Sequence, residues 1–344
     1  MEKGFIRGII FVLFEILIVT LIVGLNFFPT PAALASGIID RYSSYYLSQN
    51  DQEPRNGAIK VTFFGTTMLL FDDGETRLML DGYITRPSLI SRRIRDISTD
   101  PALVDAALAR AQVDKVDALF VAHSHFDHAL DIAYIAQKTG AHLYGSESTL
   151  NIGRGGDLPE EQMTFYEPGS PVPIGKFIVT VLPSKHSPPV RGVNDNLGMV
   201  IDHPLRQPAD FFDYVEGGSF DFLIQHGDHA IFVKPAANYI EGALDQVRAD
   251  VLFLATGTLG NQDAAFREAF YEQTVAKVQP TLVIPVHWDN FNKPLSDSLT
   301  ALTPLDLKIS FDFLIPRLTA DQIRFGIMQG FQSILLFDNE RNSS

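Results

Sequence analysis

Residues 116–128 read VDALFVAHSHFDH, in which seven mostly apolar residues are followed at once by three histidines and an aspartate. The apolar part is typical of a buried strand. In an extended chain, residues two positions apart point to the same side, so His123 and His125 face one point. Asp127 and His128 follow in the first turn of an expected helix, facing the same region. The stretch therefore predicts a metal site at the end of a buried strand, and the alternative is a set of histidines packed in a polar turn.

The donor atoms indicate which ion fits this site. The chain contains no cysteine, so every protein ligand is a nitrogen or an oxygen atom. Imidazole nitrogens and carboxylate oxygens at about 2.0–2.2 Å suit Zn²⁺, and Mn²⁺ or Fe are competitors. We expect Zn²⁺ as one or two ions, and a hydrolytic ion rather than a structural zinc held by thiolates.

Two further histidines follow strand-like runs. His186 comes shortly after residues 177–182, and His287 comes directly after residues 281–286. In α/β folds the side chains at strand ends converge on one site. We therefore predict His186 and His287 as additional metal ligands.

The remaining pattern predicts an α/β fold. Residues 58–81 contain three β-rich runs with an Asp73-Gly74 turn signal between the second and third. Helices are expected over 101–113, 128–140 and 264–279, further strands over 116–123, 141–145, 177–186, 249–257 and 281–287, and a hairpin over 220–233. Both halves place strands first and a strand–helix–strand unit second. This order predicts two mixed sheets packed face to face with helices outside, a four-layer αββα sandwich.

The motif H-x-H-x-D-H, with the later histidines in order, resembles the metallo-β-lactamase superfamily over roughly Ala58 to Phe337. Three further motifs resemble the branch with L-ascorbate-6-phosphate lactonase-like hydrolases and N-acyl-phosphatidylethanolamine phospholipase D-like phosphodiesterases; these are Phe64-Gly65-Thr66-Thr67, Leu80-Asp81 and Ile284-Pro285-Val286-His287-Trp288-Asp289. The resemblance implies one metal on His123, His125 and His186, and a second on Asp127, His128 and His287. It also implies that Asp81 supports the histidine loop. Trp288 and Asp289 either line the pocket or serve in core packing and a rim salt bridge.

The sequence departs from the superfamily at one position. A bridging aspartate is usually found at a strand end, often in Gly-Asp-Thr or Gly-Asp-Ser. The nearest match here, Asp228, lies in the middle of His226-Gly227-Asp228-His229, which is typical of a hairpin turn. We predict that Asp228 is a turn residue, that His226 and His229 face solvent, and that alanine occupies the bridging position. The second metal would then be held weakly.

The N-terminus predicts export. Residues 8–28 are largely apolar with one charge, Glu15, and are long enough to span a bilayer; Lys3 and Arg7 precede them. Ala33-Leu34-Ala35 has the small-x-small form of a cleavage site, so a retained anchor and a cleaved signal peptide stay open. Either places the body outside the cytoplasm, anchored to the membrane or free in the periplasm or medium. We expect a signal or anchor at 1–36, a linker or loosely docked helix at 37–56, one hydrolase domain at 57–338 and a tail at 339–344.

Composition excludes some functions. The chain has 344 residues and a formal net charge of −14, which disfavours binding to nucleic acid. The ligand set predicts a hydrolase that uses metal-activated water, with Asp127 as the catalytic residue that orients the water and accepts its proton. Expected substrates are small or lipid-like phosphodiesters, lactones or esters. The alternative is a non-catalytic, membrane-anchored metal-binding or interaction protein on a degenerate hydrolase scaffold, and the oligomeric state stays open.

Overall fold

The computed structural model describes residues 37–55, 57–189 and 196–338. The predicted apolar segment at 8–28, the possible cleavage site before Ser36 and the C-terminal tail lie outside these residues. Within the described residues, no helix is both long and apolar enough to cross a membrane.

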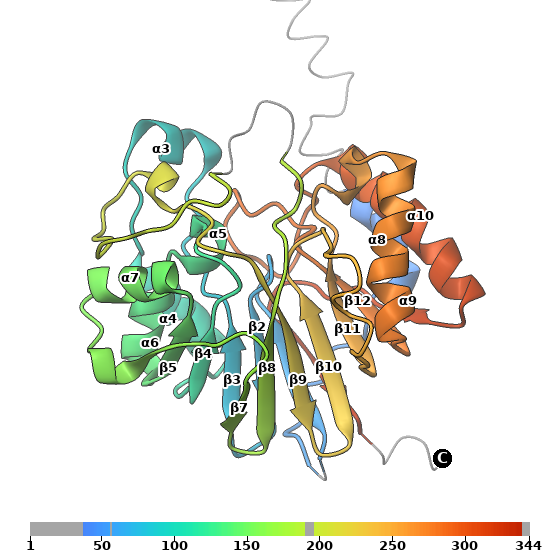
Figure 1. Cartoon of the computed structure of the whole chain (residues 1–344), viewed down its shortest axis with the longest axis horizontal. Helices are drawn as coiled ribbons and strands as arrows, with labels where there is room; N and C mark the ends of the chain where they lie inside the picture. Colours follow the sequence, from blue (N-terminus) through green and yellow to red (C-terminus); the bar gives the residue numbers. More distant parts are fainter. Residues whose placement is uncertain (1–36, 56, 190–195, 339–344) are drawn as a thin grey trace, which may run out of the picture.

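The described chain folds into two seven-stranded mixed sheets that pack face to face (Figure 1). In spatial order, the first sheet consists of β14 (Gln332–Leu336), β1 (Ile59–Phe63), β2 (Leu69–Asp72), β3 (Arg77–Leu80), β4 (Ala118–Phe120), β5 (His142–Gly145) and β6 (Met163–Phe165). The second consists of β13 (Arg324–Phe325), β12 (Leu282–Val286), β11 (Val251–Ala255), β10 (His229–Lys234), β9 (Phe220–His226), β8 (Phe177–Pro183) and β7 (Pro171–Ile174).

Both sheets combine antiparallel and parallel pairing in the same way. In the first sheet, the strands from β14 to β3 pair antiparallel, and those from β3 to β6 pair parallel. In the second, β7 to β10 pair antiparallel and β10 to β13 pair parallel. This is the predicted order of strands first and strand–helix–strand second in each half.

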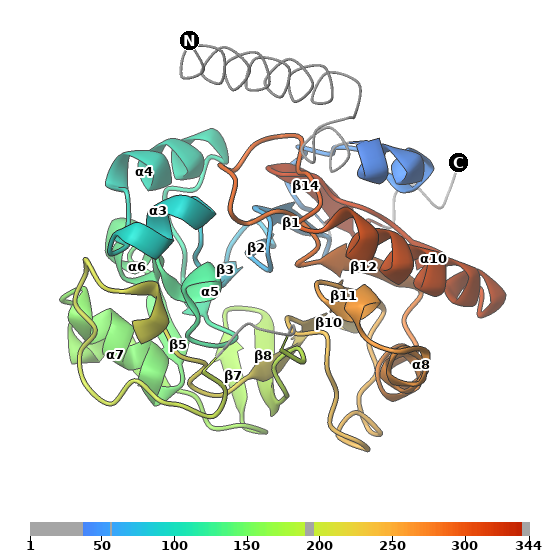
Figure 2. The same cartoon turned by 90° about the horizontal axis from the view of Figure 1, so that it is seen from above.

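Helices cover the outer face of each sheet (Figure 2). The helices on the first sheet's side are α3 (Leu89–Ile94), α4 (Pro101–Arg110), α5 (Phe126–Ala129), α6 (Ile132–Thr139) and α7 (Glu147–Gly155). Those on the second sheet's side are α8 (Ala264–Gln273), α9 (Val275–Val278) and α10 (Pro304–Ala320). Short 3-10 helices are η1 (Asp40–Tyr45), η2 (Glu160–Gln162), η3 (Phe211–Asp213) and η4 (Leu259–Asn261).

Three buried apolar clusters define the four layers. One lies between the sheets, one between the first sheet and its helices, and one between the second sheet and its helices. The predicted αββα sandwich is therefore confirmed for the described chain. Because both faces of each sheet are covered, the central strands are apolar on both sides rather than alternating.

Several helix boundaries differ from the prediction for local reasons. The helix predicted over 101–113 ends at Arg110, since Gln112 takes a left-handed conformation with φ of 57°. The helix predicted over 128–140 is divided into α5 and α6 near Asp131, whose carboxylate accepts hydrogen bonds from the backbone of Ile84 and Thr85. The helix predicted over 264–279 is interrupted at Thr274.

The segment predicted as a linker or loosely docked helix packs on the body. Ile39 and Tyr42 belong to the cluster between the sheets, and the Tyr42 hydroxyl donates a 2.8 Å hydrogen bond to Asp312 on α10. The Asp73-Gly74 turn between β2 and β3 is confirmed, with Asp72 paired to Arg77 across it.

Candidate metal centre

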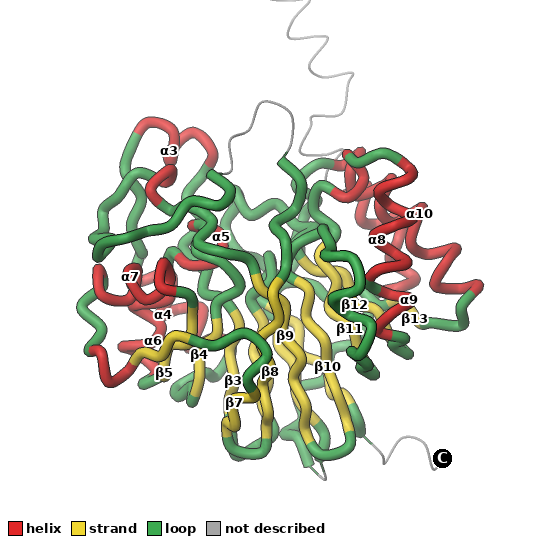
Figure 3. Tube along the Cα trace, viewed as in Figure 1, coloured by secondary structure: helices red, strands yellow, loops and turns green. Residues whose placement is uncertain are grey.

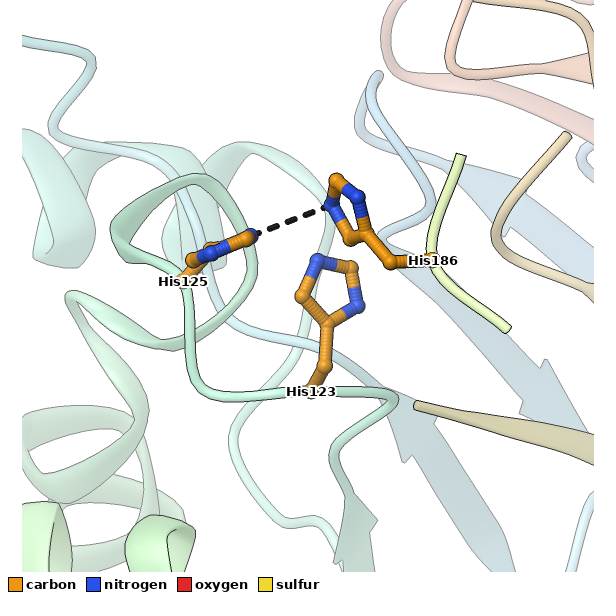
Figure 4. Close-up of side chains that lie close together, drawn as sticks. All are labelled: His123, His125 and His186. Carbon is orange, nitrogen blue, oxygen red and sulfur yellow. Dashed lines mark hydrogen bonds between the residues drawn. The ribbon is translucent and has the colours of Figure 1, made fainter. Parts of the chain in front are cut away.

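The structure brings the six predicted ligands together in two groups of three. His123, His125 and His186 form one group, drawn in Figure 4, and Asp127, His128 and His287 form the other. Within each group the ligand atoms lie within 4.8 Å of one another. His125 Nδ1 lies 3.1 Å from His186 Nε2, and Asp127 Oδ2 lies 3.4 Å from His287 Nε2. The grouping is the one that the superfamily resemblance implied.

Each ligand lies just beyond the end of a strand. His123 and His125 lie in the loop after β4, Asp127 and His128 lie on α5, and His186 and His287 follow β8 and β12. Figure 3 shows loops at this end of the sandwich, with the helices α3 and α5 among them. The first sheet therefore provides four ligands, and the second sheet provides the ligand that completes each group.

Asp81 fixes the orientation of His128. Its Oδ2 lies 2.7 Å from His128 Nδ1 and also accepts a hydrogen bond from the Thr67 hydroxyl. Its Oδ1 accepts a 2.8 Å hydrogen bond from the backbone of Ala122, directly before His123. A carboxylate that holds Nδ1 leaves Nε2 of the imidazole directed at the metal position. Asp81 thus supports the histidine loop, as the resemblance implied.

A buried ion pair holds the loop at His287. Arg86 Nη1 lies 2.8 Å from Asp289 Oδ2, and both side chains are at most 1% exposed. The other carboxylate oxygen of Asp289 accepts a 2.7 Å hydrogen bond from Thr66, whose own carbonyl accepts a 2.6 Å bond from His287. Gly65 leaves room for the pair, since an added Cβ would lie 2.1 Å from Arg86 Nη2.

Asp289 therefore belongs to a buried ion pair and not to the pocket lining. Trp288 is a core residue that is 3% exposed. Asp289 and Trp288 therefore serve in a salt bridge and in core packing, and not in lining the pocket.

The loop of His186 is attached to the segment that follows β10. Asn238 donates a 2.7 Å hydrogen bond to the carbonyl of His186, and the backbone of Ala237 donates to the Ser187 hydroxyl at 2.8 Å. Lys234 donates to the Ser184 hydroxyl at 3.1 Å. This strand end, where the superfamily resemblance implied a bridging aspartate, therefore holds the His186 loop in place.

Burial and neighbouring charge set the protonation of the ligands. Burial, with the positive charge of neighbouring histidines, lowers the pKa of His123 far below its usual value and that of His186 to about 3. Burial alone would raise the pKa of Asp127, but His128 and His287 outweigh it and bring that pKa well below its usual range. At neutral pH the site therefore presents two neutral imidazoles and an ionised carboxylate, which are the forms that bind metal.

Unpaired ring nitrogens indicate that this site fits a metal. Both nitrogens of His123, Nε2 of His128 and Nδ1 of His287 are buried without a hydrogen-bond partner among the described residues. A buried polar atom left unpaired costs about 1–3 kcal/mol, so such atoms are rare without a function. Metal ions bound in the two groups would satisfy one nitrogen of His123 and Nε2 of His128. The donor set, five imidazoles and one carboxylate, suits Zn²⁺, Mn²⁺ or Fe.

The predictions for the remaining histidines and for Asp228 have mixed outcomes. Asp228 is an exposed residue of the β9–β10 turn, at the opposite end of the sandwich from α5 (Figure 1). The prediction that His226 faces solvent is wrong, because it is 7% exposed and lies 3.0 Å from Asp73 in the β2–β3 turn. His229 is half-buried, with its ring stacked on Phe337 at 4.0 Å.

Sequence reasoning missed the residues that hold the ligands in place. Arg86, Lys234 and Asn238 belong to no local motif, and their partners lie between 13 and 203 positions away in the chain. A basic residue within the buried strand β10 was the one available signal, because a lysine at such a position requires a charged partner.

Comparison with known proteins agrees with this geometry. A model of the beta-lactamase superfamily domain matches residues 87–288. A protein from Polynucleobacter asymbioticus named UPF0173 metal-dependent hydrolase is 25% identical over 221 residues, which is 62% of this chain and 72% of that protein. One of the same name from Polaromonas sp. is 27% identical over 233 residues, which is 61% of this chain and 80% of that protein.

The same fold occurs in a metallo hydrolase from the archaeon Ignicoccus hospitalis, with a TM-score of 0.50 at 15% identity over 81% of this chain and 98% of that chain. This likeness concerns the fold alone. The family match covers more than half of the chain, and the paired sheets and ligand-bearing loops agree with it. The chain belongs to the beta-lactamase superfamily, and its two-sheet sandwich is the metallo-β-lactamase fold.

Proposed function

We propose that this metal-dependent hydrolase cleaves a phosphodiester, lactone or ester bond with water at the two ligand groups. The proposal rests on the two groups of three residues, because the ligand atoms of each group lie within 4.8 Å of one another. When bound there, Zn²⁺ would polarise the substrate oxygen and bring the pKa of a water molecule to about 7. The identity of the metal as zinc is also part of this proposal.

Asp127 is the catalytic residue in this proposal. Its carboxylate lies between the two imidazoles of its group, 3.4 Å from His287 Nε2 and 3.9 Å from His128 Nε2. His128 and His287 keep it ionised, so it accepts hydrogen bonds and donates none. It therefore orients the attacking water and accepts its proton, while Asp81 keeps His128 in place.

The histidines cannot perform this proton transfer once they bind metal, because the nitrogen facing the site is then occupied. The serines beside them are also engaged: Ser184 accepts from Lys234, and Ser187 accepts from Ala237. The arrangement thus supports direct attack by water without a covalent intermediate.

The surface around the site supports a lipid-like substrate. Several large apolar side chains are exposed on α3 and on the segment from 197 to 212; these are Leu89, Ile90, Ile94, Leu197, Met199, Val200 and Phe212. Both segments lie at the end of the sandwich that carries the ligand loops (Figure 1). Exposed apolar side chains on segments at the same end as a binding site are consistent with contact with an apolar ligand or a membrane.

We further propose that the chain works outside the cytoplasm, anchored by residues 8–28 or released after cleavage. The apolar character of that segment and the preceding Lys3 and Arg7 support this placement. Such a location favours an amphiphilic substrate of the kind handled by lactonase-like or phospholipase D-like relatives. The net charge of −14 supports a substrate other than nucleic acid.

One observation favours a second function, that of a non-catalytic metal-binding or interaction protein. Lys234 is followed by Pro235, Ala236, Ala237 and Asn238, so no carboxylate is present where relatives place the bridging aspartate. A site without this negative charge holds its second ion less tightly. Metal occupancy without turnover would be the result expected of this function.

The test combines metal analysis with a substrate panel. The purified chain is assayed with bis(p-nitrophenyl) phosphate, a simple lactone and p-nitrophenyl acetate, and its metal content is measured by elemental analysis. We expect H123A to lose both metal and turnover, and D127N to lose turnover. H203A, which changes an exposed histidine paired with Asp202, is the matched control. Turnover that persists in metal-free H123A would refute the proposal, and stoichiometric metal without turnover on any substrate would favour the second function.

A further inference from the structure

Arg92 on α3 lies in a cage of aromatic rings. Its guanidinium carbon lies 4.7 Å from the ring centre of Phe126, 5.5 Å from that of Phe211 and 5.8 Å from that of Phe291. The rings contact one another, since Phe126 packs edge-on against both Phe211 and Phe291. The three phenylalanines come from distant parts of the chain, so the cage is a tertiary structure around one cation.

Two of the three guanidinium nitrogens of Arg92 lack an acceptor in the described part of the chain. Its Nε and Nη1 are buried without a hydrogen-bond partner among the described residues. Four other arginines lie over aromatic rings in the described part of the chain, and each donates to an acceptor: Arg86 to Asp289, Arg110 to Asp297, Arg267 to the carbonyl of Gln262, and Arg317 to Glu268. Arg92 differs from them in this respect.

The cage borders the metal centre. Phe126 lies between the ligands His125 and Asp127 in the chain, and the ring of Phe291 lies 5.6 Å from the ring of His287. The negative charge of Asp127 also reaches Arg92: burial lowers the pKa of the guanidinium, and Asp127 acts in the opposite direction. Arg92 therefore stands beside both ligand groups without being paired to either.

An unpaired, partly buried guanidinium is unfavourable in the free protein. Cation–π contact with the rings offsets part of the lost hydration but provides no hydrogen-bond acceptor. The rings also exclude water, which strengthens any ionic bond formed there. The planar guanidinium matches the two oxygens of a phosphate or carboxylate group, and such charge-assisted pairs are among the strongest hydrogen bonds in proteins.

We infer that Arg92, with Phe126, Phe211 and Phe291, forms an anion-binding subsite that holds an acidic group of the substrate while the bond to be cleaved lies at the metal centre. The inference rests on the proposed function and narrows its substrate class to anionic compounds. Arg92 as a residue is half-buried, and Nη2 is not among its buried unpaired nitrogens, so an acidic group would approach the guanidinium at Nη2. The exposed Leu89, Ile90 and Ile94 on the same helix lie beside it and suit an apolar portion of the same substrate.

The experiment first measures anion binding without turnover. Benzenesulfonate, an anion that coordinates metal ions poorly, is titrated into the metal-loaded chain by calorimetry. We expect the wild type to bind it, R92M to bind it roughly 10- to 100-fold more weakly, and R92K to bind with intermediate affinity. R93M is the matched control, because Arg93 is the exposed neighbour on the same helix. Equal affinity in R92M and R93M, or no binding by the wild type up to about 10 mM, would overturn the inference.

A kinetic comparison then separates this inference from the proposed function. In R92M we expect KM for mono-p-nitrophenyl glutarate, an ester whose free carboxylate is separate from the bond to be cleaved, to rise by roughly tenfold or more with little change in kcat. KM for the neutral p-nitrophenyl acetate should stay the same. If KM for both substrates changes equally, Arg92 is not an anion subsite. If the wild type turns over neither these esters nor any other substrate of the panel, the proposed function fails, while the benzenesulfonate titration still decides the role of Arg92.

Discussion

The Nδ1 atom of His128 lies 2.7 Å from the carboxylate of Asp81, and both side chains are at most 1% exposed. His128 is thereby fixed before any ion arrives, with Nε2 free for a metal. Burial acts to lower the pKa of His128, but Asp81 and Asp127 outweigh it and raise that pKa. The contact with Asp81 thus both orients the ring and makes its nitrogen a stronger base.

We expect D81N to weaken metal binding by roughly 10- to 100-fold, because an amide does not hold the ring or raise its basicity as a carboxylate does. Competition with a chelator of known affinity measures the change. D228N is the control, since it alters an exposed aspartate in the distant hairpin turn. An unchanged affinity in D81N would show that Asp81 does not orient His128.

We expect metal loading to stabilise the fold. Bound ions would satisfy some of the buried ring nitrogens that lack partners, and saturation at about 100 times the Kd contributes about 2.7 kcal/mol. Thermal unfolding with added Zn²⁺ should give a higher Tm than unfolding with a chelator. H186A should lose most of this increment and H203A should keep it; a Tm independent of metal in the wild type would contradict the expectation.

Lys234 and Asp221 form a buried ion pair beneath the His186 loop, 2.9 Å apart and 1% and 3% exposed. We expect K234M to lower the free energy of unfolding by about 3–5 kcal/mol, because the Asp221 carboxylate is left buried without its partner. Urea unfolding measures the loss, and K185M, at an exposed lysine, is the control.

The double variant K234M/D221L tests the cause, since removal of both charges should recover much of the stability lost in K234M. If the double variant is as unstable as the sum of the two single variants, packing and not charge explains the effect.

The carboxyl group of Asp306 provides a pH-dependent contribution to stability. It accepts 3.0 Å hydrogen bonds from the backbone of Thr258 and Asn261, but burial raises its pKa from 3.8 to about 6. The folded chain therefore binds this proton at higher pH than the unfolded chain. The penalty of the buried charge is fully present above pH 6 and decreases as pH falls toward 4.

We expect the wild type to gain stability relative to D306N as the pH is lowered from 7 to 5, by about 1 kcal/mol. Urea unfolding of both proteins at the two pH values measures the difference. Parallel pH dependence of the two proteins would show that Asp306 does not titrate in this range.

Much of the fold could be predicted because the decisive signals are local. The central strands are apolar runs bounded by turn residues, and the ligands follow their ends directly, so β4 with His123 and β12 with His287 could be recognised without any contact information. The order of these apolar runs along the chain predicted the two sheets. β7 was missed because two of its four residues are proline, which is typical of an edge strand but gives no strand signal.

The residues that organise the site could not be predicted in the same way. Arg86 and Asp289 pair across 203 positions, and Asn238 contacts the His186 carbonyl across 52. Such pairs depend on how the sheets dock, which no local pattern encodes. His226 was placed in solvent for the same reason, since its partner Asp73 lies in the hairpin of the other sheet.

Because the ligands are divided between the two sheets, a complete metal site forms only when both halves of the chain have folded and docked. Four ligands come from the first sheet's loops, and His186 and His287 from the second sheet complete one group each. A chain in which only one half has folded thus carries no complete site. We therefore expect an ion captured before the halves dock to be held by fewer ligands and more weakly, so that retained metal would mark correctly assembled molecules.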